Sequence, residues 1–137
     1  MKFACLVYHE HKDNISEAEL SAIVAECRDA AAWNEGIRKA GHHIYTSGLQ
    51  GPTTARTVRK PNGKLSITDG PYAETKECLG GFTIIEARDM NEALELVSKF
   101  PARLTSVEVR PVMDPNAELT DPGDRLVMSA MARPSWL

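Results

Sequence analysis

The order in which strand-like and helix-like segments follow one another is the feature that most limits what this chain can fold into. Short apolar runs typical of buried strands alternate with stretches of helical periodicity along residues 1–113. With one polar hairpin set aside, the order is strand, helix, strand, strand, helix, strand. This is the ferredoxin-like βαββαβ arrangement, so the predicted fold class is α+β with an inserted β-hairpin. The predicted strands are 2–8, 42–49, 82–86 and 105–112.

Both predicted helices begin with a recognisable cap. Ser16 precedes Glu19 by three residues, and Asp89 precedes Glu92 by the same spacing. In such a capping box the first side chain accepts a hydrogen bond from the backbone N–H three residues later, which favours a helix start. Gly41 stands where a glycine commonly ends a helix.

Apolar residues recur at helical spacing in the first predicted helix, and we expect them to face the sheet. They are Leu20, Ile23, Val24, Cys27 and Ala31. Trp33 and Ile37 lie to one side of this stripe. The helix therefore either bends or packs against two different surfaces.

The hairpin is predicted from Pro61-Asn62-Gly63, which separates the extended runs 54–60 and 64–68. Asn-Gly between two extended runs is a strong hairpin signal, because both residues tolerate positive φ. The two arms carry little apolar surface. We therefore expect the hairpin to project from the core.

The stretch from Asp69 to Phe82 is the most unusual in the chain and reads DGPYAETKECLGGF. A rigid Gly-Pro turn leads into a dense run of charge. Gly80-Gly81 then allows a bulge or a close backbone approach at the entry to a strand. The pair lacks the spacing of a phosphate-binding loop.

These residues carry a resemblance to a known family over roughly residues 1–113. Asp69–Glu77, Leu79–Phe82 and Ser106–Val112 resemble the YCII-related family, in particular its DGPF-motif branch, with Tyr72 in place of the usual phenylalanine. The resemblance implies a dimeric α+β barrel in a bacterial cytosol. Related barrels include small-molecule isomerases, monooxygenases and a dehydrochlorinase, and some YCII-type members are thought to use a His-Asp pair. Members of this branch are also associated with extracytoplasmic-function sigma factors.

The topology by itself also predicts a homodimer. In a βαββαβ sheet both helices cover one face, and the other face remains uncovered and partly apolar. Such a face commonly packs against a partner sheet. Residues 114–137, which contain two Asp-Pro steps and one Pro-Gly step, are predicted to form a C-terminal tail that packs on the 1–113 domain or on the dimer partner. A solvated tail is the alternative.

The candidate site lies at the end of the sheet where the DGPF-like stretch enters. His9 leaves the first strand there and is the hypothetical general base, with Asp69 as its partner or as the acid. The residues expected to bind a ligand are Asn34, Gln50, Tyr72, Glu74, Lys76 and Glu108. Simpler interpretations stay open: Asp69 builds a turn, the charged loop is solvated, and Glu108 pairs with Arg110. The sequence leaves open whether His9 approaches Asp69.

Composition excludes several classes of partner. A net charge of −3 and a pI near 5.8 argue against a broad nucleic-acid footprint. No apolar run approaches the ~18 residues of a membrane span. Three widely spaced cysteines without a CxxC motif indicate reduced thiols and a cytoplasmic location. His9 and His11 share one side of an extended chain, but a third metal ligand is not evident, so no metal is expected.

Two functions follow from these observations, and the sequence leaves both open. The first is a cofactor-free small-molecule enzyme of isomerase, lyase or hydrolase type, because no cofactor motif is visible. The alternative is a non-catalytic binding or regulatory module, linked by the resemblance to an extracytoplasmic-function sigma factor. In that case the hairpin and the charged loop would form the surface for a protein partner.

Overall fold

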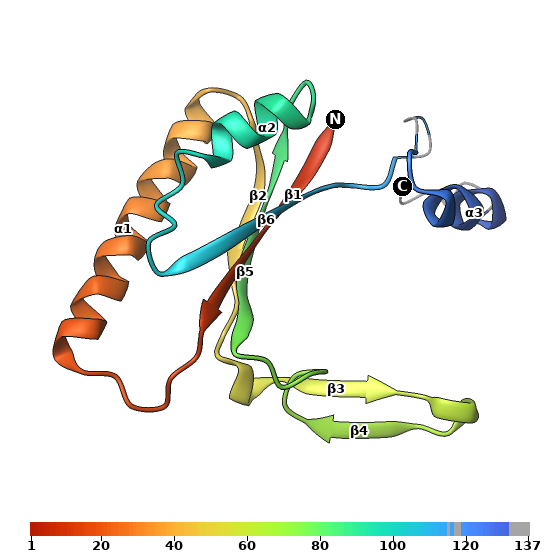
Figure 1. The fold of residues 1–137 in the computed structure, drawn as a ribbon, viewed down its shortest axis with the longest axis horizontal. Coiled ribbons are helices and arrows are strands. Elements are labelled where there is room, and N and C mark those ends of the chain that lie inside the picture. The colour runs from red at the N-terminus through yellow and green to blue at the C-terminus, as the bar shows by residue number, and fades with distance from the viewer. Residues whose placement is uncertain (115, 117–118, 132–137) are drawn as a thin grey trace.

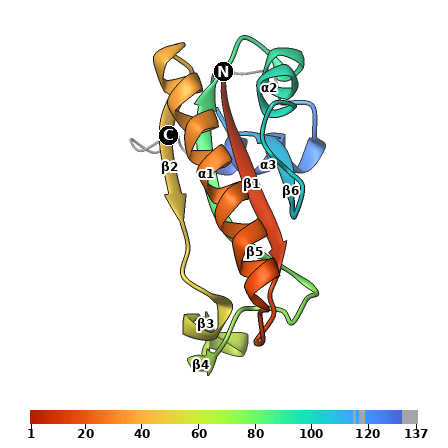
Figure 2. The same cartoon turned by 90° about the vertical axis from the view of Figure 1, so that its left-hand side faces the viewer.

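A four-stranded antiparallel sheet with two helices on one face forms the body of the molecule (Figures 1 and 2). The computed structural model describes residues 1–114, 116 and 119–131. The strands lie in the order β2-β5-β1-β6, which is that of a ferredoxin-like fold and confirms the predicted α+β class. The elements of the body are β1 (Lys2–Glu10), α1 (Glu17–Lys39), β2 (His43–Gly48), β5 (Glu77–Glu86), α2 (Met90–Val97) and β6 (Thr105–Pro111).

The predicted hairpin is present as a separate two-stranded sheet. Its strands are β3 (Arg56–Arg59) and β4 (Ser66–Asp69), joined by a turn over Pro61–Gly63 in which Asn62 and Gly63 both have positive φ. Figure 1 shows the hairpin projecting from one end of the main sheet. Val58, Leu65 and Ile67 are exposed on it.

Both predicted helix caps are confirmed. The Ser16 hydroxyl accepts the backbone N–H of Glu19 at 3.1 Å, and the Asp89 carboxylate accepts that of Glu92 at 2.9 Å. Gly41 follows α1 with φ of +83°, the left-handed conformation that glycine adopts most readily. Local sequence therefore determined where both helices begin.

The face of α1 that packs on the sheet differs from the predicted one. Leu20 and Val24 of the predicted stripe are 53% and 40% exposed, and Cys27 is exposed as well. The side chains that pack inward are those of Glu26, Ala30, Trp33 and Ile37. For Leu20 and Val24 the prediction was wrong, because α1 diverges from the sheet toward its N-terminus, as Figure 1 shows. Ile23 and Cys27 of the same stripe line the space that this divergence leaves. The C-terminal half of α1, where Trp33 and Ile37 lie, decides the orientation.

The core lies between the sheet and the C-terminal half of α1. Its buried members are Phe3, Cys5, Ile37, Ile85, Ala87 and Ala93. Trp33 closes it from the side, donating its indole N–H to the Leu96 carbonyl at 2.9 Å and meeting the edge of Phe100. Burial raises the pKa of Cys5 to about 11, so this thiol stays protonated and is a packing residue.

The second face of the sheet, called here the open sheet face, has no helix of the described residues packed on it. Since Phe3 and Cys5 point toward the helices, strand alternation places Leu6 and Tyr8 on the opposite face. Phe82 and Tyr45 lie there too, with ring centroids 5.9 Å apart. Glu108 and Arg110 form the predicted ion pair at its edge, at 3.7 Å.

The predicted tail contains one more helix, α3 (Pro122–Ala130), which is capped by Asp121. Figure 1 shows α3 set apart from the sheet, and Leu126 and Val127 are exposed on it. Docking of the tail on the domain or on a partner stays a prediction, and residues 132–137 lie outside the described part of the chain.

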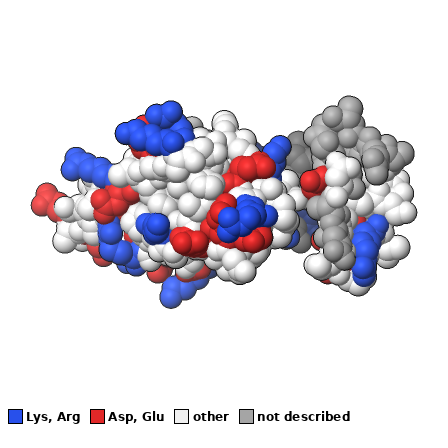
Figure 3. Space-filling model, turned by 90° about the horizontal axis from the view of Figure 1, so that it is seen from above, with Lys and Arg blue, Asp and Glu red and all other residues white. Residues whose placement is uncertain are grey.

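Acidic and basic side chains are interspersed on the face seen in Figure 3, which shows no single-sign patch there. Among the helices of the described residues, none combines the length and the apolar character needed to cross a membrane.

Candidate functional site

A cleft of about 550 Å³ lies between the N-terminal half of α1 and the ends of β1, β5 and β6. It exists because α1 diverges from the sheet at this end. Aliphatic side chains form much of its wall, and several ionisable groups interrupt them. The lining residues are Val7, His9, Glu10, His11, Lys12, Ile15, Glu19, Ala22, Ile23, Glu26, Cys27, Gly80, Leu104 and Thr105.

His9 reaches this cleft because strand alternation places it on the helix-covered side of β1, after Phe3, Cys5 and Val7. Val7 pairs with Gly81 and Tyr8 with Leu79, so Gly80 is an extra, bulged residue in β5. A Cβ atom on Gly80 would lie 2.4 Å from the His9 ring. The missing side chain makes room for the imidazole, which confirms the predicted bulge and close approach.

The hydrogen bond of His9 determines which ring nitrogen is free. Its Nδ1 lies 3.2 Å from the carbonyl oxygen of Glu10. A carbonyl only accepts, so Nδ1 carries the proton in this bond, and in the neutral ring Nε2 is the acceptor. Nε2 can therefore take a proton from a bound molecule.

Glu26 is a buried ionisable residue of the cleft that the sequence interpretation missed. It is only 5% exposed, and its Oε1 accepts the backbone N–H groups of Arg103 and Leu104 at 2.6 and 2.8 Å. The Arg103 guanidinium turns instead to Asp29, at 2.8 Å. A signal existed, because Glu26 lies on the backward extension of the Trp33–Ile37 stripe, where a carboxylate is unexpected.

Thr105 pairs with His9 across β1 and β6 and also lines the cleft. Its hydroxyl oxygen is buried and has no hydrogen-bond partner within the described residues. A buried hydroxyl without a partner is uncommon and costs free energy. It adds a polar group to the same side of the cleft as His9.

Asp69 lies elsewhere, at the end of β4 in the hairpin. Its carboxylate is 89% exposed and pairs with Arg56 at 3.1 Å. No hydrogen bond or ion pair joins it to His9 in the part of the chain that the structure describes. The structure therefore leaves the two predicted catalytic residues apart, and their pairing stays a prediction.

Asn34 occupies a polar contact between helix and sheet. The hydroxyls of Thr46 and Thr83 donate to its Oδ1 at 2.8 and 3.3 Å, and its own amide donates to the Ala30 carbonyl. This network satisfies polar groups between α1 and the strands β2 and β5. Asn34 does not line the cleft.

The remaining predicted ligand-binding residues also lie outside the cleft. Tyr72 is exposed, with the Arg59 guanidinium 5.6 Å from the centre of its ring. Glu108 is on the open sheet face, and Gln50, Glu74 and Lys76 are exposed in loops. Of the eight predicted site residues, the structure places only His9 in the cleft.

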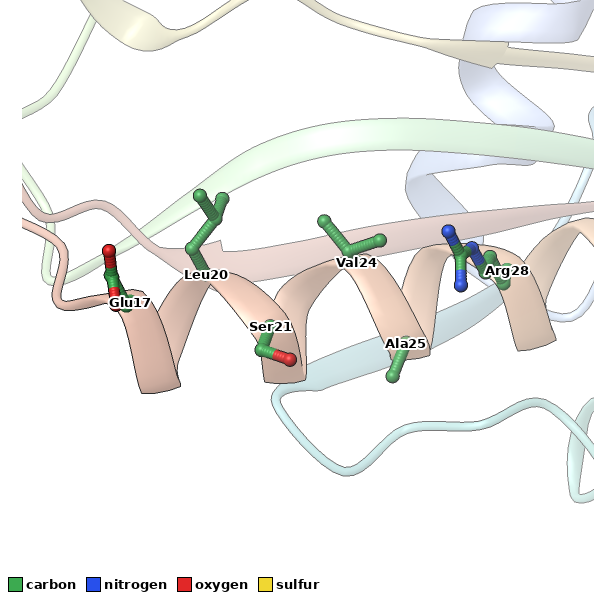
Figure 4. A pocket seen from close by; sticks show the side chains of 6 residues that line it. All are labelled: Glu17, Leu20, Ser21, Val24, Ala25 and Arg28. Atoms are coloured by element: carbon green, nitrogen blue, oxygen red, sulfur yellow. The ribbon is translucent and has the colours of Figure 1, made fainter.

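A second, shallower hollow of about 410 Å³ runs along α1 (Figure 4). Leu20 and Val24 project from the same side of the helix there, and Glu17 and Arg28 stand at its two ends. It has no histidine or cysteine in its lining. Part of the predicted apolar stripe, Leu20 and Val24, therefore lines this hollow. The hollow lacks a side chain of the kind that usually exchanges protons near neutral pH.

Comparison with known proteins gives three results. A family model described as "YCII-related domain" matches residues 1–116. An uncharacterised protein of Rhizobium meliloti (strain 1021) is 36% identical over 88 residues, which make up 62% of this chain and 71% of that protein. The solved structure of 5-chloro-2-hydroxyhydroquinone dehydrochlorinase (TftG) from Burkholderia phenoliruptrix AC1100, in complex with 2,5-dihydroxybenzoquinone, gives a TM-score of 0.47. That alignment has 16% identity and covers 82% of this chain and 94% of the other.

Proposed function

This chain belongs to the YCII-related domain family, and from that premise we propose that the cleft under α1 binds a small organic molecule and that His9 transfers a proton to or from it. The observation that carries the proposal is the free Nε2 of His9 inside a cleft of about 550 Å³. The reactions that such a site supports without a cofactor are isomerisation, elimination and hydrolysis. Within the family we place the chain in the DGPF-motif branch and in the bacterial cytosol.

The surroundings of His9 support this role. The ring is half-buried, its Nδ1–H is held by a backbone carbonyl, and aliphatic side chains such as Val7 and Ile23 exclude part of the water. A histidine fixed in one tautomer near neutral pH is suited to general acid–base catalysis. The absence of a side chain at Gly80 allows the ring to lie in this position.

Substitution of His9 is the test of this proposal. We expect His9→Gln to lower the turnover of a substrate by about a hundredfold or more, the usual contribution of a positioned acid or base. A panel of small hydroxylated and carbonyl compounds, followed by NMR for both binding and conversion, supplies the substrate. Conversion by His9→Gln at the wild-type rate contradicts the proposal, as does a panel that neither binds in the cleft nor reacts.

Asp69→Asn is the matched variant for the same assay. Because Asp69 pairs with Arg56 and is exposed, this geometry supports a structural role in the hairpin. A loss equal to that of His9→Gln would instead support the His9–Asp69 pair and require the hairpin to move toward the cleft.

We also infer a homodimer that buries the open sheet face. Leu6, Tyr8 and Phe82 would be covered by the same residues of a second copy. We expect light scattering after size exclusion to give twice the chain mass of 15.1 kDa at micromolar concentration. Leu6→Glu should give a monomer, whereas Val58→Glu on the projecting hairpin should leave the dimer intact. A monomeric wild type contradicts this inference.

A binding or regulatory module is the second candidate function. The observation that favours it is the hairpin, whose exposed Val58, Leu65 and Ile67 have no partner in the described chain. A two-stranded hairpin is marginally stable in isolation, so such a surface gains from a protein partner. An extracytoplasmic-function sigma factor is the partner that the family resemblance suggests. Partner binding that is indifferent to His9→Gln would separate this function from the enzymatic one.

A further inference from the structure

Glu26 and His9 line the same cleft, and we propose that Glu26 is the anchor for the charged end of the ligand, which is a protonated amine on an apolar body. This inference rests on the cleft being the ligand site proposed above and names the class of molecule that it takes. It concerns binding, and assigns no reaction step to Glu26.

One carboxylate oxygen of Glu26 remains open to a further hydrogen bond. Both backbone N–H donors from Arg103 and Leu104 go to Oε1, and within the described residues Oε2 has no hydrogen bond or ion pair. A carboxylate has about four acceptor positions, so a donor can still be added at Oε2. The side chain is 5% exposed and lines the cleft, which leaves the cleft as the direction of approach.

Within the described residues, no ion pair neutralises Glu26. The guanidinium of Arg103, whose backbone N–H donates to Glu26, is itself paired with Asp29. Lys12 pairs with Glu19 at 3.8 Å, and His11 lies 3.5 Å from Asp13. The lining therefore holds three carboxylates, on Glu10, Glu19 and Glu26, against one ammonium group. A cationic ligand complements this charge, and an anionic ligand is repelled by it.

The walls of the cleft around Glu26 are largely aliphatic. Val7, Ile15, Ile23 and Leu104 offer aliphatic surface for an apolar body. A mostly apolar cleft with a few convergent polar groups is the usual form of a small-molecule site. The charged nitrogen would lie at Glu26, and Nε2 of His9 would face another part of the same molecule.

Three small probes of matched size test the inference. Benzylammonium, benzyl alcohol and phenylacetate share a ring and a one-carbon arm but differ in charge. The ¹H–¹⁵N spectrum of the wild-type protein, titrated with each, reports binding through the amides of Val7, Leu104 and Thr105. We expect benzylammonium to bind at least about tenfold more tightly than either other probe, as a hydrogen bond to a charged group warrants.

Glu26→Gln is the informative variant. A glutamine retains an oxygen that accepts the N–H groups of Arg103 and Leu104, so the loop that carries these two residues stays bonded to α1. The negative charge is lost. We expect the preference for benzylammonium to disappear. The inference is overturned if wild-type protein binds phenylacetate as tightly as benzylammonium, if millimolar probe moves no cleft amide, or if the preference persists in Glu26→Gln. The wild-type comparison stands even if this variant folds poorly.

His9→Gln separates this inference from the proposed function. That variant should keep the preference for benzylammonium, because it leaves Glu26 untouched. Preference retained together with normal turnover would refute proton transfer by His9 and leave the ligand class standing. If the wild type shows no preference for benzylammonium but His9→Gln loses turnover, the ligand class is refuted and proton transfer by His9 is supported.

Discussion

Phe3→Ala is expected to lower the free energy of unfolding by about 3–5 kcal/mol, the usual cost of removing a fully buried aromatic ring. Phe3 is 0% exposed and lies in β1, the strand that pairs with both β5 and β6. Its partners across the sheet are Ile85 and Pro111, and its ring faces the helices. Urea unfolding followed by circular dichroism measures the change.

Phe82→Ala is the matched control, because it removes the same ring from the opposite face of the sheet. In a dilute monomer we expect a smaller loss than for Phe3→Ala, since Phe82 is only partly buried. If the open sheet face forms the dimer, the loss caused by Phe82→Ala should grow with protein concentration. Equal losses from both substitutions at every concentration would contradict the assignment of Phe3 to the core.

Gly81→Ala is expected to cost about 3 kcal/mol, near the upper end of the usual penalty for overpacking. A Cβ atom at this position would lie 2.8 Å from the carbonyl oxygen of Ser47 and 3.3 Å from the Cα of Gly48. Both contacts are with backbone of β2, which pairs with β5 at this point. The methyl group therefore forces the edge strand away, and hydrogen bonds of the ladder are lost.

Gly80→Ala, one residue earlier, is the control that isolates this effect. The three atoms nearest to its Cβ would all belong to the side chain of His9, which can rotate, and Gly80 is not among the glycines with positive φ. We expect a change in stability within about 1 kcal/mol. Binding in the cleft should nevertheless suffer, because the displaced imidazole enters it. Thermal unfolding of both variants, with probe titration of Gly80→Ala, checks the pair. Equal destabilisation by the two would contradict the assignment.

Much of the fold was predictable because its signals are local. The caps at Ser16 and Asp89, the left-handed Gly41 and the Asn62-Gly63 turn each depend on a few neighbouring residues. The βαββαβ order then limits the sheet to few topologies, since crossovers are right-handed. The bulge at Gly80 was also expected from the glycine pair, although its partner, the His9 ring, was not.

The buried face of α1 could not be predicted, because helical periodicity offered two overlapping stripes. Leu20 and Val24 belong to the more hydrophobic one, but that end of the helix diverges from the sheet. Trp33 and Ile37 belong to the other, and they pack where the helix meets the strands. Hydropathy along one helix contains no information about its distance from the sheet at either end.

The candidate site shows the same division. His9 was predicted from its residue type and its place at the end of the first strand. The structure places its side chain on the helix-covered side of β1. Glu26 became part of the site only in three dimensions, because its partners are backbone groups 77 and 78 residues further along the chain. Asp69 was assigned to the site because of its motif and the end of the sheet at which that motif lies. In the structure it belongs to the hairpin and pairs with Arg56. The sequence by itself determined the main elements of residues 1–113 and their order, whereas the side of β1 on which His9 lies depends on the register that the structure shows. Tertiary packing alone decided which charged side chains share the cleft. The free energy of burying a carboxylate depends on its hydrogen-bond donors, and the donors to Glu26 are too far along the chain to be recognised from the sequence.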